Sequence, residues 1–407
     1  MPRRIWKLSG VLVRADILER STRGGFNLIE VKSGTTVKEI NEQDVAIQVW
    51  VLRGAGVNVA SAGLLTLNRG YVYDGKQLDV YRLFRYHNLD DAVAEHLPWI
   101  GENITHLQAI LTADDAPEIE PGDHCFAPYE CAYYDFCTRD WEYPEHPISD
   151  LPRLHASKLE QLEHREIEEI GDIPDDFPLS KPQAIVRLSV ITGAEHVSPQ
   201  LPDELSRLSY PVRYLDFESF SPAIPRYAGT RCYDMIPFQF SMHMEEHDGE
   251  VTHREFLWTG DGDPRRPLAL ALLENAGDKG PICVYSGFER RVIKALCKEL
   301  PDLSMELEAL LDRLWDLLKV VKSHYYHRDL HGSFSIKQVL PVLVPEMSYA
   351  DLAIADGREA SAAYQSSLDC DDARARQRIH DALKEYCRQD TLAMVALRRA
   401  LSQKSPD

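Results

Sequence analysis

Val212-Arg-Tyr-Leu-Asp-Phe-Glu-Ser-Phe220 is the stretch of sequence that decides the fold of the second half of the chain. Its apolar residues are typical of a buried strand, and the two-residue period of a strand sends the side chains of Asp216 and Glu218 out of the same face. Two carboxylates on one face of a buried strand form a candidate acidic metal site.

A second informative stretch, Glu385-Tyr-Cys-Arg-Gln-Asp390, lies near the end of the chain. The region is strongly helical, and residues four apart on a helix project from one face. We therefore expect Tyr386 and Asp390 to reach the same site as the two strand carboxylates. Hydrolysis of phosphodiesters by two divalent cations needs several converging carboxylates, so this set predicts a metal-dependent nuclease.

The composition indicates a folded α/β protein of two domains. The chain has 407 residues, of which 44% are hydrophobic and 27% charged, and these are globular values. We found no secretory leader and no apolar run of membrane-spanning length, which predicts a cytoplasmic protein without a membrane partner. Eight cysteines in this setting favour reduced thiols or metal ligands over disulfides. A net charge of -20 is unusual for a protein that binds phosphates, although acidic metal sites and local basic patches are compatible with it.

Hydrophobic periodicity predicts strands around one helix in the first part of the chain, and strands followed by helices in the second. In the first part we expect strands at 7–19, 26–33 and 64–73 and helices at 43–53 and 89–111. In the second part we expect strands at 212–220, 236–244, 254–258 and 282–285 and helices at 266–275, 288–300, 305–322 and 374–401. Prolines and acidic runs predict a connecting segment at 143–208, between domains at 1–142 and 209–404.

The acidic motifs of the second half resemble those of the DEDDy subgroup of DnaQ-like 3′–5′ exonucleases, over about residues 209–400. Asp216, Glu218 and Asp390 match three of the acids of that family, and Tyr386 matches its tyrosine. The resemblance implies an RNase H-like mixed sheet and catalysis with Mg²⁺ or Mn²⁺. It also implies that the Tyr386 phenol orients the attacking water.

The third acid of that family lies where a strand passes into a helix. Here Tyr285-Ser-Gly-Phe-Glu289 takes that place, so the resemblance makes Glu289 the third acid and a metal ligand. The glutamate is one methylene longer than the aspartate of the family, and Asp312 and Asp316 on the next helical stretch are competitors for the role.

The first half carries a second set of residues with the spacing of a nuclease core. Asp16 is followed by Glu30 and Lys32 at the end of a predicted strand, and alternation puts Glu30 and Lys32 on one face. This pattern resembles the RecB-like PD-(D/E)xK nucleases, which have a restriction-endonuclease-like core. The resemblance implies that Asp16 and Glu30 bind Mg²⁺, that Lys32 acts on the attacking water, and that Gln48 is a motif glutamine.

Cys125, Cys131 and Cys137 follow this core and resemble the C-terminal cysteines of RecB-like nucleases that close their fold with a [4Fe-4S] cluster. The fourth cysteine of that family comes from far upstream, and no cysteine precedes Cys125 in this chain. The helical element that precedes the core in the family is absent as well. Two interpretations stay open: a chain shortened at its start, or a first domain that only holds substrate. A zinc site and buried free thiols are alternatives to the cluster.

Other polar residues of the second half carry weaker patterns. His324, His327 and His331 suggest zinc, but no cysteine partners them at finger spacing, and we interpret the region as a loop that contacts nucleic acid or caps the fold. Arg328 and Lys337 in this region are candidates for phosphate contact. The remaining cysteines are interpreted as core or surface thiols, and Cys387 as filler of its helix.

The sequence as a whole predicts a nuclease that acts on DNA or RNA, with the exonuclease chemistry in the second domain. A different class stays open, in which both sites are degenerate and the protein is a nucleic-acid-binding or scaffold component of a repair or defence system. An iron-sulfur electron-transfer protein is a third alternative, which would require a complete cluster.

Overall fold

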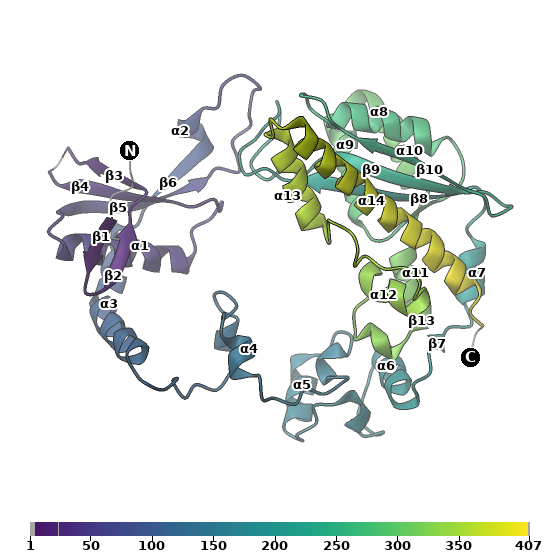
Figure 1. Ribbon diagram of the computed structural model, residues 1–407, viewed down its shortest axis with the longest axis horizontal. Coiled ribbons are helices and arrows are strands. Elements are labelled where there is room, and N and C mark those ends of the chain that lie inside the picture. Colours follow the sequence, from purple (N-terminus) through teal and green to yellow (C-terminus); the bar gives the residue numbers. More distant parts are fainter. Residues whose placement is uncertain (1–4, 23, 406–407) are drawn as a thin grey trace. The chain divides into compact units, whose positions relative to one another are not determined.

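The computed structural model describes residues 5–22 and 24–405, and these form two compact units. The first unit contains the described residues up to Trp141 together with the segment Pro222–Asp234. The second unit contains Glu142–Ser221 and the described residues from Met235 onward. Each unit combines helices with a sheet, which confirms the predicted α/β class (Figure 1).

The first unit contains a two-stranded hairpin and a four-stranded sheet of order β3-β4-β5-β6. Strands β4 and β5 are parallel, and the two outer pairs are antiparallel. The strands are β1 (Ile5–Leu8), β2 (Val11–Arg14), β3 (Ile17–Arg20), β4 (Phe26–Val31), β5 (Val59–Leu67) and β6 (Phe84–Asn88). The helices are α1 (Glu39–Gly54), α2 (Val80–Leu83), α3 (Asp90–Leu111), η1 (Asp123–Cys125) and α4 (Tyr134–Cys137).

Helix α1 supplies the core of the first unit. Val45, Val49 and Leu52 lie on one side of the helix, are fully buried, and share a cluster with Leu28 of β4 and Leu64 of β5. Because α1 follows β4 in the chain and packs on the sheet beside it, polar residues at the end of β4 meet the early turns of α1.

The second unit is built on a mixed five-stranded sheet of order β10-β9-β8-β11-β12. Strands β8, β11 and β12 are parallel, whereas β9 and β10 are antiparallel to their neighbours. The strands of the unit are β7 (His196–Val197), β8 (Val212–Phe220), β9 (Ile236–Glu245), β10 (Val251–Leu257), β11 (Ile282–Val284), β12 (Leu314–Asp316) and β13 (Tyr325–Tyr326). The helices up to β12 are η2 (Ile148–Asp150), α5 (Ala156–Glu163), η3 (Ile170–Asp172), α6 (Lys181–Thr192), α7 (Leu201–Ser206), α8 (Arg265–Ala276), α9 (Phe288–Glu299), η4 (Pro301–Leu303) and α10 (Ser304–Leu311). The helices after β12 are α11 (Leu317–His324), η5 (Arg328–Leu330), α12 (Ile336–Leu343), α13 (Gly357–Leu368) and α14 (Ala373–Ser402).

Alternate side chains of β8 point to opposite faces of the sheet and pack in two separate hydrophobic clusters. Leu215 and Phe217 share one hydrophobic cluster with α8 and α9, whereas Val212 and Tyr214 share the other with α14. Helix α14 packs along β8 and β9, and Figure 1 shows it running across the sheet. Asp216 and Glu218 have the parity of Tyr214, so they leave the sheet on the α14 side.

The single helix expected at 305–322 is wrong. Helix α10 ends at Leu311, the short strand β12 pairs in parallel with β11, and α11 begins only at Leu317. The leucines of this region have helical spacing on both sides of β12, and a three-residue strand carries no period of its own.

Residues 143–208, expected to connect the domains, pack as part of the second unit instead. Leu162, Ile170 and Val186 come from α5, η3 and α6 and are buried in the cluster that contains α14. Strand β7 also pairs with β13, with Val197 opposite Tyr325. The prediction of a connecting segment relied on prolines and acidic residues and gave too little weight to the apolar residues that pack in the core.

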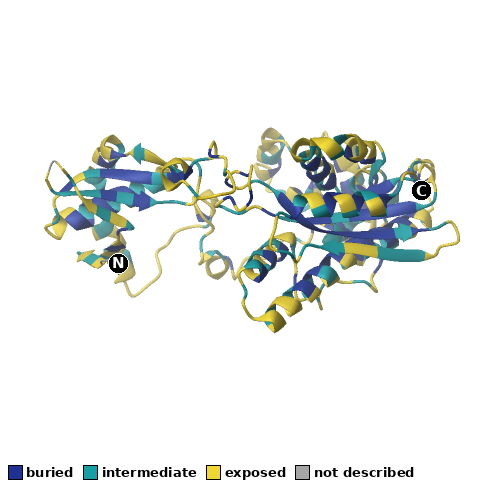
Figure 2. Ribbon diagram, turned by 90° about the horizontal axis from the view of Figure 1, so that it is seen from above, coloured by how far each residue is buried: buried dark blue, intermediate teal, exposed yellow. Residues whose placement is uncertain are grey.

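Buried residues follow the strands of each unit and the inward faces of its helices, as Figure 2 shows. Within the described ranges, none of the helices combines the length and the apolar character that crossing a membrane requires.

Candidate active site in the second unit

Three carboxylates from β8 and α14 form the centre of the candidate site. Asp216 and Glu218 leave one face of β8, and Asp390 projects from α14, which packs on that face. Each of the three offers an oxygen atom, and these oxygens all lie within 4.8 Å of one another. The structure therefore brings together the strand pair and the helical aspartate that the sequence pattern singled out. Oxygen ligands grouped in this way suit a hard divalent cation.

Burial and mutual repulsion make this site unfavourable for three negative charges. Burial raises the pKa of Asp216 and of Glu218 well above the ordinary range, and the charge of Asp390 raises both further. Burial raises the pKa of Asp390 itself to about 6. Lys337 acts in the opposite direction, because its positive charge lowers the pKa of Glu218 and of Asp390. A divalent cation among the carboxylates would relieve the same repulsion more strongly.

Glu289 lies in the first turn of α9 and lines the same cleft. Its side chain is buried, and its Oε2 atom has no hydrogen-bond partner among the residues that the structure describes. Burial raises the pKa of Glu289 to about 8, with a smaller contribution from the charge of Asp316. A buried carboxylate oxygen without a partner is unfavourable unless a proton or a cation satisfies it. Among the described residues, the group of oxygens within 4.8 Å contains Asp216, Glu218 and Asp390 but not Glu289.

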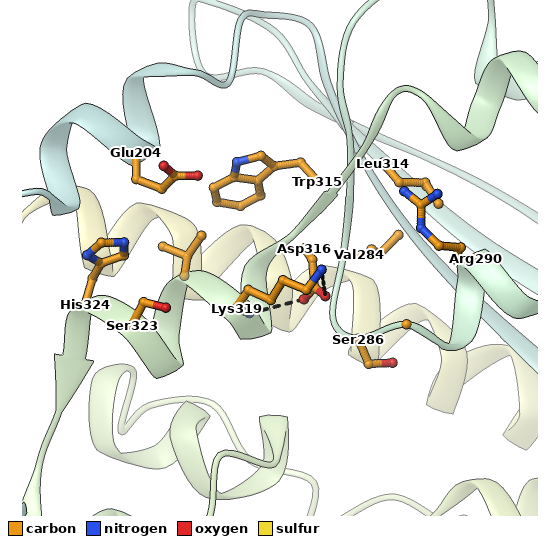
Figure 3. A pocket seen from close by; sticks show the side chains of 12 residues that line it. Glu204, Val284, Ser286, Arg290, Leu314, Trp315, Asp316, Lys319, Ser323 and His324 are labelled. Atoms are coloured by element: carbon orange, nitrogen blue, oxygen red, sulfur yellow. Dashed lines mark hydrogen bonds and ion pairs between the residues drawn. The ribbon is translucent and has the colours of Figure 1, made fainter. Parts of the chain in front are cut away.

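The competing acids Asp312 and Asp316 lie elsewhere. Asp316 caps α11, where its Oδ1 accepts a hydrogen bond from the backbone of Lys319 at 3.2 Å and its Oδ2 lies 3.7 Å from Lys319 Nζ. It lines a neighbouring cavity of about 490 Å³ with Trp315 (Figure 3). Asp312 follows the last residue of α10. Within the described part of the chain, neither acid lines the carboxylate cleft, whereas Glu289 does.

Two tyrosines and a lysine surround Asp390. The Tyr349 hydroxyl donates a hydrogen bond to Asp390 Oδ1 at 2.7 Å. Lys337 on α12 places its Nζ 5.4 Å from the ring centre of Tyr349 and 5.2 Å from that of Tyr386. The same Nζ lies 3.5 Å from the Tyr386 hydroxyl oxygen. Burial and the nearby carboxylates raise the pKa of Tyr386, so the phenol stays protonated and can donate a hydrogen bond to water.

A cleft of about 480 Å³ opens over the carboxylates. Its lining residues are Asp216, Phe217, Glu218, Ser219, Tyr285, Ser286, Phe288, Glu289, Asp356, Gly357, Arg358, Tyr386 and Asp390. Asp356 caps α13 by accepting hydrogen bonds from the backbone of Arg358 and Glu359, and this cap brings Gly357 close to Glu218. A Cβ atom at Gly357 would lie 3.7 Å from Glu218 Oε2. The Arg358 side chain is exposed and adds a positive charge at the rim.

The sequence analysis did not identify Tyr349, and it did not predict the contacts that Lys337 and Cys387 make in the site. Tyr349 lies outside regular secondary structure, so no periodicity marks it. Lys337 was predicted only as a phosphate contact, yet it lies against the tyrosines beside Asp390. Cys387 was interpreted as helix filler, and its buried Sγ donates to Asp216 Oδ2 at 3.5 Å. Its position three residues before Asp390 was the available indication, because residues three apart on a helix share a face.

The first unit brings its predicted residues together where β4 meets α1. Lys32 Nζ donates to Glu30 Oε1 at 2.9 Å and to Asp44 Oδ2 at 2.6 Å. Gln48 Nε2 donates to Glu30 Oε2 at 3.0 Å. Asp16 lies beside this group, since its Oδ2 accepts a backbone hydrogen bond from β4 at 3.1 Å. Asp44 was not predicted, although it precedes Gln48 by one helical turn and so shares its face.

The three cysteines predicted to bind a cluster are free thiols of decreasing burial from Cys125 through Cys131 to Cys137, and Cys232, a fourth free and buried thiol, also belongs to the first unit. The backbone N–H of Cys131 donates to the carbonyl of Cys125 at 2.7 Å, which folds this loop back on itself. Among the described residues, the close groups of three or more potential metal ligands contain no cysteine. The iron-sulfur cluster therefore stays a prediction.

Arg328, His324 and His327 lie outside the carboxylate cleft. Arg328 forms ion pairs with Asp329 at 3.6 Å and with Glu145 at 3.8 Å. His327 Nδ1 accepts a hydrogen bond from the backbone of Asp329 at 3.2 Å. His324 lines the cavity of Figure 3, across from Trp315. Within the described chain, these two histidines do not form a metal-ligand group with His331.

Comparison with known proteins found a match to one protein family. No curated protein and no solved structure gives a significant match to this chain. One family model matches residues 213–335, from β8 through Glu289 to the loop before α12, and this match ends before Tyr386 and Asp390. Residues 213–335 are similar to the family described as "Domain of unknown function (DUF2779)".

Proposed function

We propose that the second unit is a 3′–5′ exonuclease that hydrolyses phosphodiesters of DNA or RNA with Mg²⁺ or Mn²⁺. The observation that carries this proposal is the convergence of Asp216, Glu218 and Asp390 beneath an open cleft, with Tyr386 beside them. The same residues carry the resemblance to the DEDDy exonucleases. A mixed sheet with β8 at its centre agrees with the RNase H-like arrangement which that resemblance implies.

The donor set fits divalent cations. The ligands are carboxylate oxygens, which hard cations such as Mg²⁺ and Mn²⁺ prefer over nitrogen or sulfur. Burial and the neighbouring carboxylates raise the pKa values of Asp216 and Glu218, so a bound cation would stabilise their ionised forms. The buried Oε2 of Glu289, which has no partner among the described residues, is a further donor in the same cleft. Asp216, Glu218, Glu289 and Asp390 would thus hold the cations.

Bound cations would supply an activated water and a stabilised leaving oxygen. The residues of the chain position the other reactants. The protonated Tyr386 hydroxyl donates a hydrogen bond that orients the attacking water. Lys337 holds a positive charge 3.5 Å from that hydroxyl and offsets the charge that develops on the phosphate. Arg358 at the rim contacts the phosphate of the next nucleotide.

The test compares the wild-type protein with Asp216→Asn and with Asp302→Asn as the matched control. Asp302 is a surface carboxylate paired with Arg266, so its variant removes one charge without entering the cleft. Each protein is incubated with Mn²⁺ or Mg²⁺ and with 5′-labelled single-stranded DNA or RNA, and the product lengths are followed over time. We expect a ladder that shortens from the 3′ end for the wild type and for Asp302→Asn. We expect Asp216→Asn to be slower by more than about 10²-fold, because one cation loses a ligand.

The outcomes separate the proposed enzyme from a binding protein. Absence of cleavage on both substrates, with nucleic-acid binding retained, would refute the exonuclease and favour the scaffold or binding role. Equal cleavage by wild type and Asp216→Asn would place any activity outside the carboxylate cleft.

One observation favours a second nuclease centre in the first unit. Lys32 is held by Glu30 and Asp44, and Gln48 is buried against Glu30, which is the arrangement expected from a PD-(D/E)xK core. Lys32→Met in the same assay tests this idea. Loss of internal cleavage with an intact 3′ ladder would assign a separate activity to the first unit, whereas an unchanged product pattern would contradict it.

A further inference from the structure

A second group of potential metal ligands lies in the same unit and takes no part in the proposed exonuclease. His146, Asp150 and His331 each offer one ligand atom, and these atoms all lie within 4.8 Å of one another. The acidic motifs do not account for this group, and the family match covers His331 but begins after His146 and Asp150. Its members come from two segments almost two hundred residues apart in the chain.

His146 provides the clearest sign that a ligand is missing. The residue is 4% exposed, and its Nε2 atom is buried without a hydrogen-bond partner in the described ranges. The nearest acidic atom is Glu145 Oε1 at 3.7 Å, which is too long for a hydrogen bond. A buried imidazole nitrogen without a partner is unfavourable unless a bound group satisfies it.

Asp150 has the same feature as His146, a buried polar atom without a hydrogen-bond partner among the described residues. Its Oδ2 atom is buried and lacks a hydrogen-bond partner among the described residues, although His331 Nδ1 lies 3.5 Å away. The rings of His146 and His331 are stacked, with centroids 5.1 Å apart and planes 21° apart. Two residues with unsatisfied buried atoms and a neighbouring imidazole therefore form one compact group of potential ligands.

The backbone holds this arrangement in place. The His146 N–H donates to both oxygens of Glu169 at 3.1 Å, which fixes the first segment. In the second segment, His331 and Gly332 both have positive φ, of 44° and 69°. A Cβ atom at Gly332 would lie 2.5 Å from the carbonyl oxygen of Asp150, so only glycine allows the two backbones to approach this closely. The close approach brings His331 to Asp150.

We propose that His146, Asp150 and His331 bind a divalent transition metal ion, with Zn²⁺ as the best fit. Neutral imidazoles and a carboxylate are ligands of Zn²⁺, whereas Mg²⁺ and Ca²⁺ prefer oxygen ligands alone. The half-exposed His331 leaves the outer side of the site open, so a water completes four-coordination. The site joins η2 and the residues just before it to the loop that leads into α12.

This position gives the metal a structural role. Only five residues separate His331 from Lys337, and Ser335 caps α12 between them. The Phe334 carbonyl also accepts a hydrogen bond from Tyr285 at 2.9 Å. A metal that ties His331 to Asp150 therefore orders the loop that leads into α12, the helix that carries Lys337. The proposal does not depend on the exonuclease, because it rests on a separate set of ligands.

The test measures metal content and does not use activity. Full-length wild type and the variants His146→Gln, Asp150→Asn and His331→Gln are loaded with excess Zn²⁺, exchanged into buffer with Mg²⁺ to occupy carboxylate sites, and analysed by mass spectrometry of the metal. His327→Gln is the matched control, because His327 lies in the same loop but outside this group of potential ligands; its Nδ1 contacts the backbone N–H of Asp329 at 3.2 Å and Asp329 Oδ2 at 3.5 Å. Asp390→Asn is the control for the carboxylate cleft.

We expect one Zn²⁺ per chain in the wild type and in both controls, and an affinity lower by at least about 100-fold in the three variants, since loss of a ligand weakens binding more than loss of a supporting hydrogen bond. Co²⁺ should give the strong visible absorption of a four-coordinate site in the wild type, and His331→Gln should abolish it. Zn²⁺ should also raise the melting temperature of the wild type but not of His331→Gln.

His331→Gln protects the test against a folding defect, because this side chain is half-exposed and its variant is expected to fold, as circular dichroism can verify. Equal Zn²⁺ content in the wild type and in folded His331→Gln would overturn the proposal. A wild-type protein that retains no Zn²⁺ after loading would overturn it as well, and the group would then be an ion pair beside a stacked imidazole.

Discussion

At the residue scale, Tyr386 is the side chain whose role in hydrolysis can be tested separately from the binding of cations. Its hydroxyl lies 3.5 Å from Lys337 Nζ, and its phenol is kept protonated by burial and by the neighbouring carboxylates, which raise its pKa. The carboxylates of Asp216, Glu218 and Asp390 offer the oxygens of the candidate cation site, and the protonated phenol adds no negative charge to them. Its proposed role is therefore to orient water.

We expect Tyr386→Phe to lower the rate of hydrolysis by about 10²-fold, because only the hydrogen bond to the attacking water is lost. The affinity for Mn²⁺, measured by calorimetry, should stay close to that of the wild type. Tyr233→Phe is the matched control, since its hydroxyl binds a backbone carbonyl in the first unit. A large loss of Mn²⁺ affinity in Tyr386→Phe would show that the phenol supports the metal site instead.

Glu289 allows a test based on stability. Burial raises its pKa to about 8, so the folded, metal-free protein holds a proton there that the unfolded chain releases near pH 4.5. Because the folded state binds more protons, its free energy of unfolding decreases as the pH rises toward 8. His243, whose pKa is lowered to about 4 by burial, acts in the opposite sense but completes its change below neutral pH.

Glu289→Gln should remove this loss of stability. In buffer with EDTA, we expect the melting temperature of the wild type to fall between pH 7 and pH 9, and that of Glu289→Gln to change less and to exceed it at pH 9. The exposed Glu306→Gln serves as the control and should follow the wild type. Identical pH profiles for all three proteins would mean that Glu289 has an ordinary pKa.

At the scale of elements, the site depends on how α14 lies against the sheet. Thr391, next to Asp390, is fully buried, and its Oγ1 lies 2.7 Å from Ser241 Oγ and 2.8 Å from His243 Nδ1 on β9. Two turns earlier in α14, the Leu383 carbonyl accepts a hydrogen bond from Gln239 at 2.9 Å. These contacts fix the rotation of the helix and thereby the position of Asp390.

Thr391→Val keeps the shape of the side chain but leaves the His243 nitrogen buried without its partner. We expect the free energy of unfolding, measured by urea titration, to fall by about 1–3 kcal/mol. Exonuclease activity should fall in the folded variant too, because Asp390 loses its alignment. Thr192→Val, at an exposed position of α6, should leave both unchanged. Wild-type stability in Thr391→Val would show that other contacts suffice to position α14.

Strong periodicity explains which elements the sequence could predict. Strand β8 and helix α14 were expected at 212–220 and 374–401 and are found at Val212–Phe220 and Ala373–Ser402. Each is long enough to show its period, and each carries its polar site residues at regular intervals. The strand β12 was missed because three residues between two leucine-rich helices show no period.

The site itself was only partly predictable for a related reason. Asp216, Glu218 and Asp390 lie on regular elements, so their faces follow from spacing alone. Tyr349 reaches its site through tertiary packing, and no local pattern marks it as functional. His331 stood out only beside His324 and His327, whereas its neighbours in the structure are His146 and Asp150, from a segment remote in sequence.

At the scale of the whole molecule, the net charge of -20 determines how a nucleic acid can bind. A polyanion approaching an acidic protein is repelled, and most nucleic-acid-binding proteins depend on a basic surface instead. The carboxylate cleft adds to the repulsion, since its own carboxylates already disfavour one another's ionisation. Two divalent cations in the cleft would neutralise the charge of its four carboxylates and remove this repulsion.

We therefore expect binding of nucleic acid to require divalent cations, apart from their role in hydrolysis. Fluorescence anisotropy with a short single-stranded DNA, in Ca²⁺ to limit cleavage, should show tighter binding than in EDTA by at least about 10-fold. Glu218→Gln should lose most of this gain because it removes a ligand, and Asp302→Asn should keep it. Strong binding in EDTA would instead locate the nucleic acid on a basic patch away from the carboxylates, and the cleft would then act only on ends delivered from that surface.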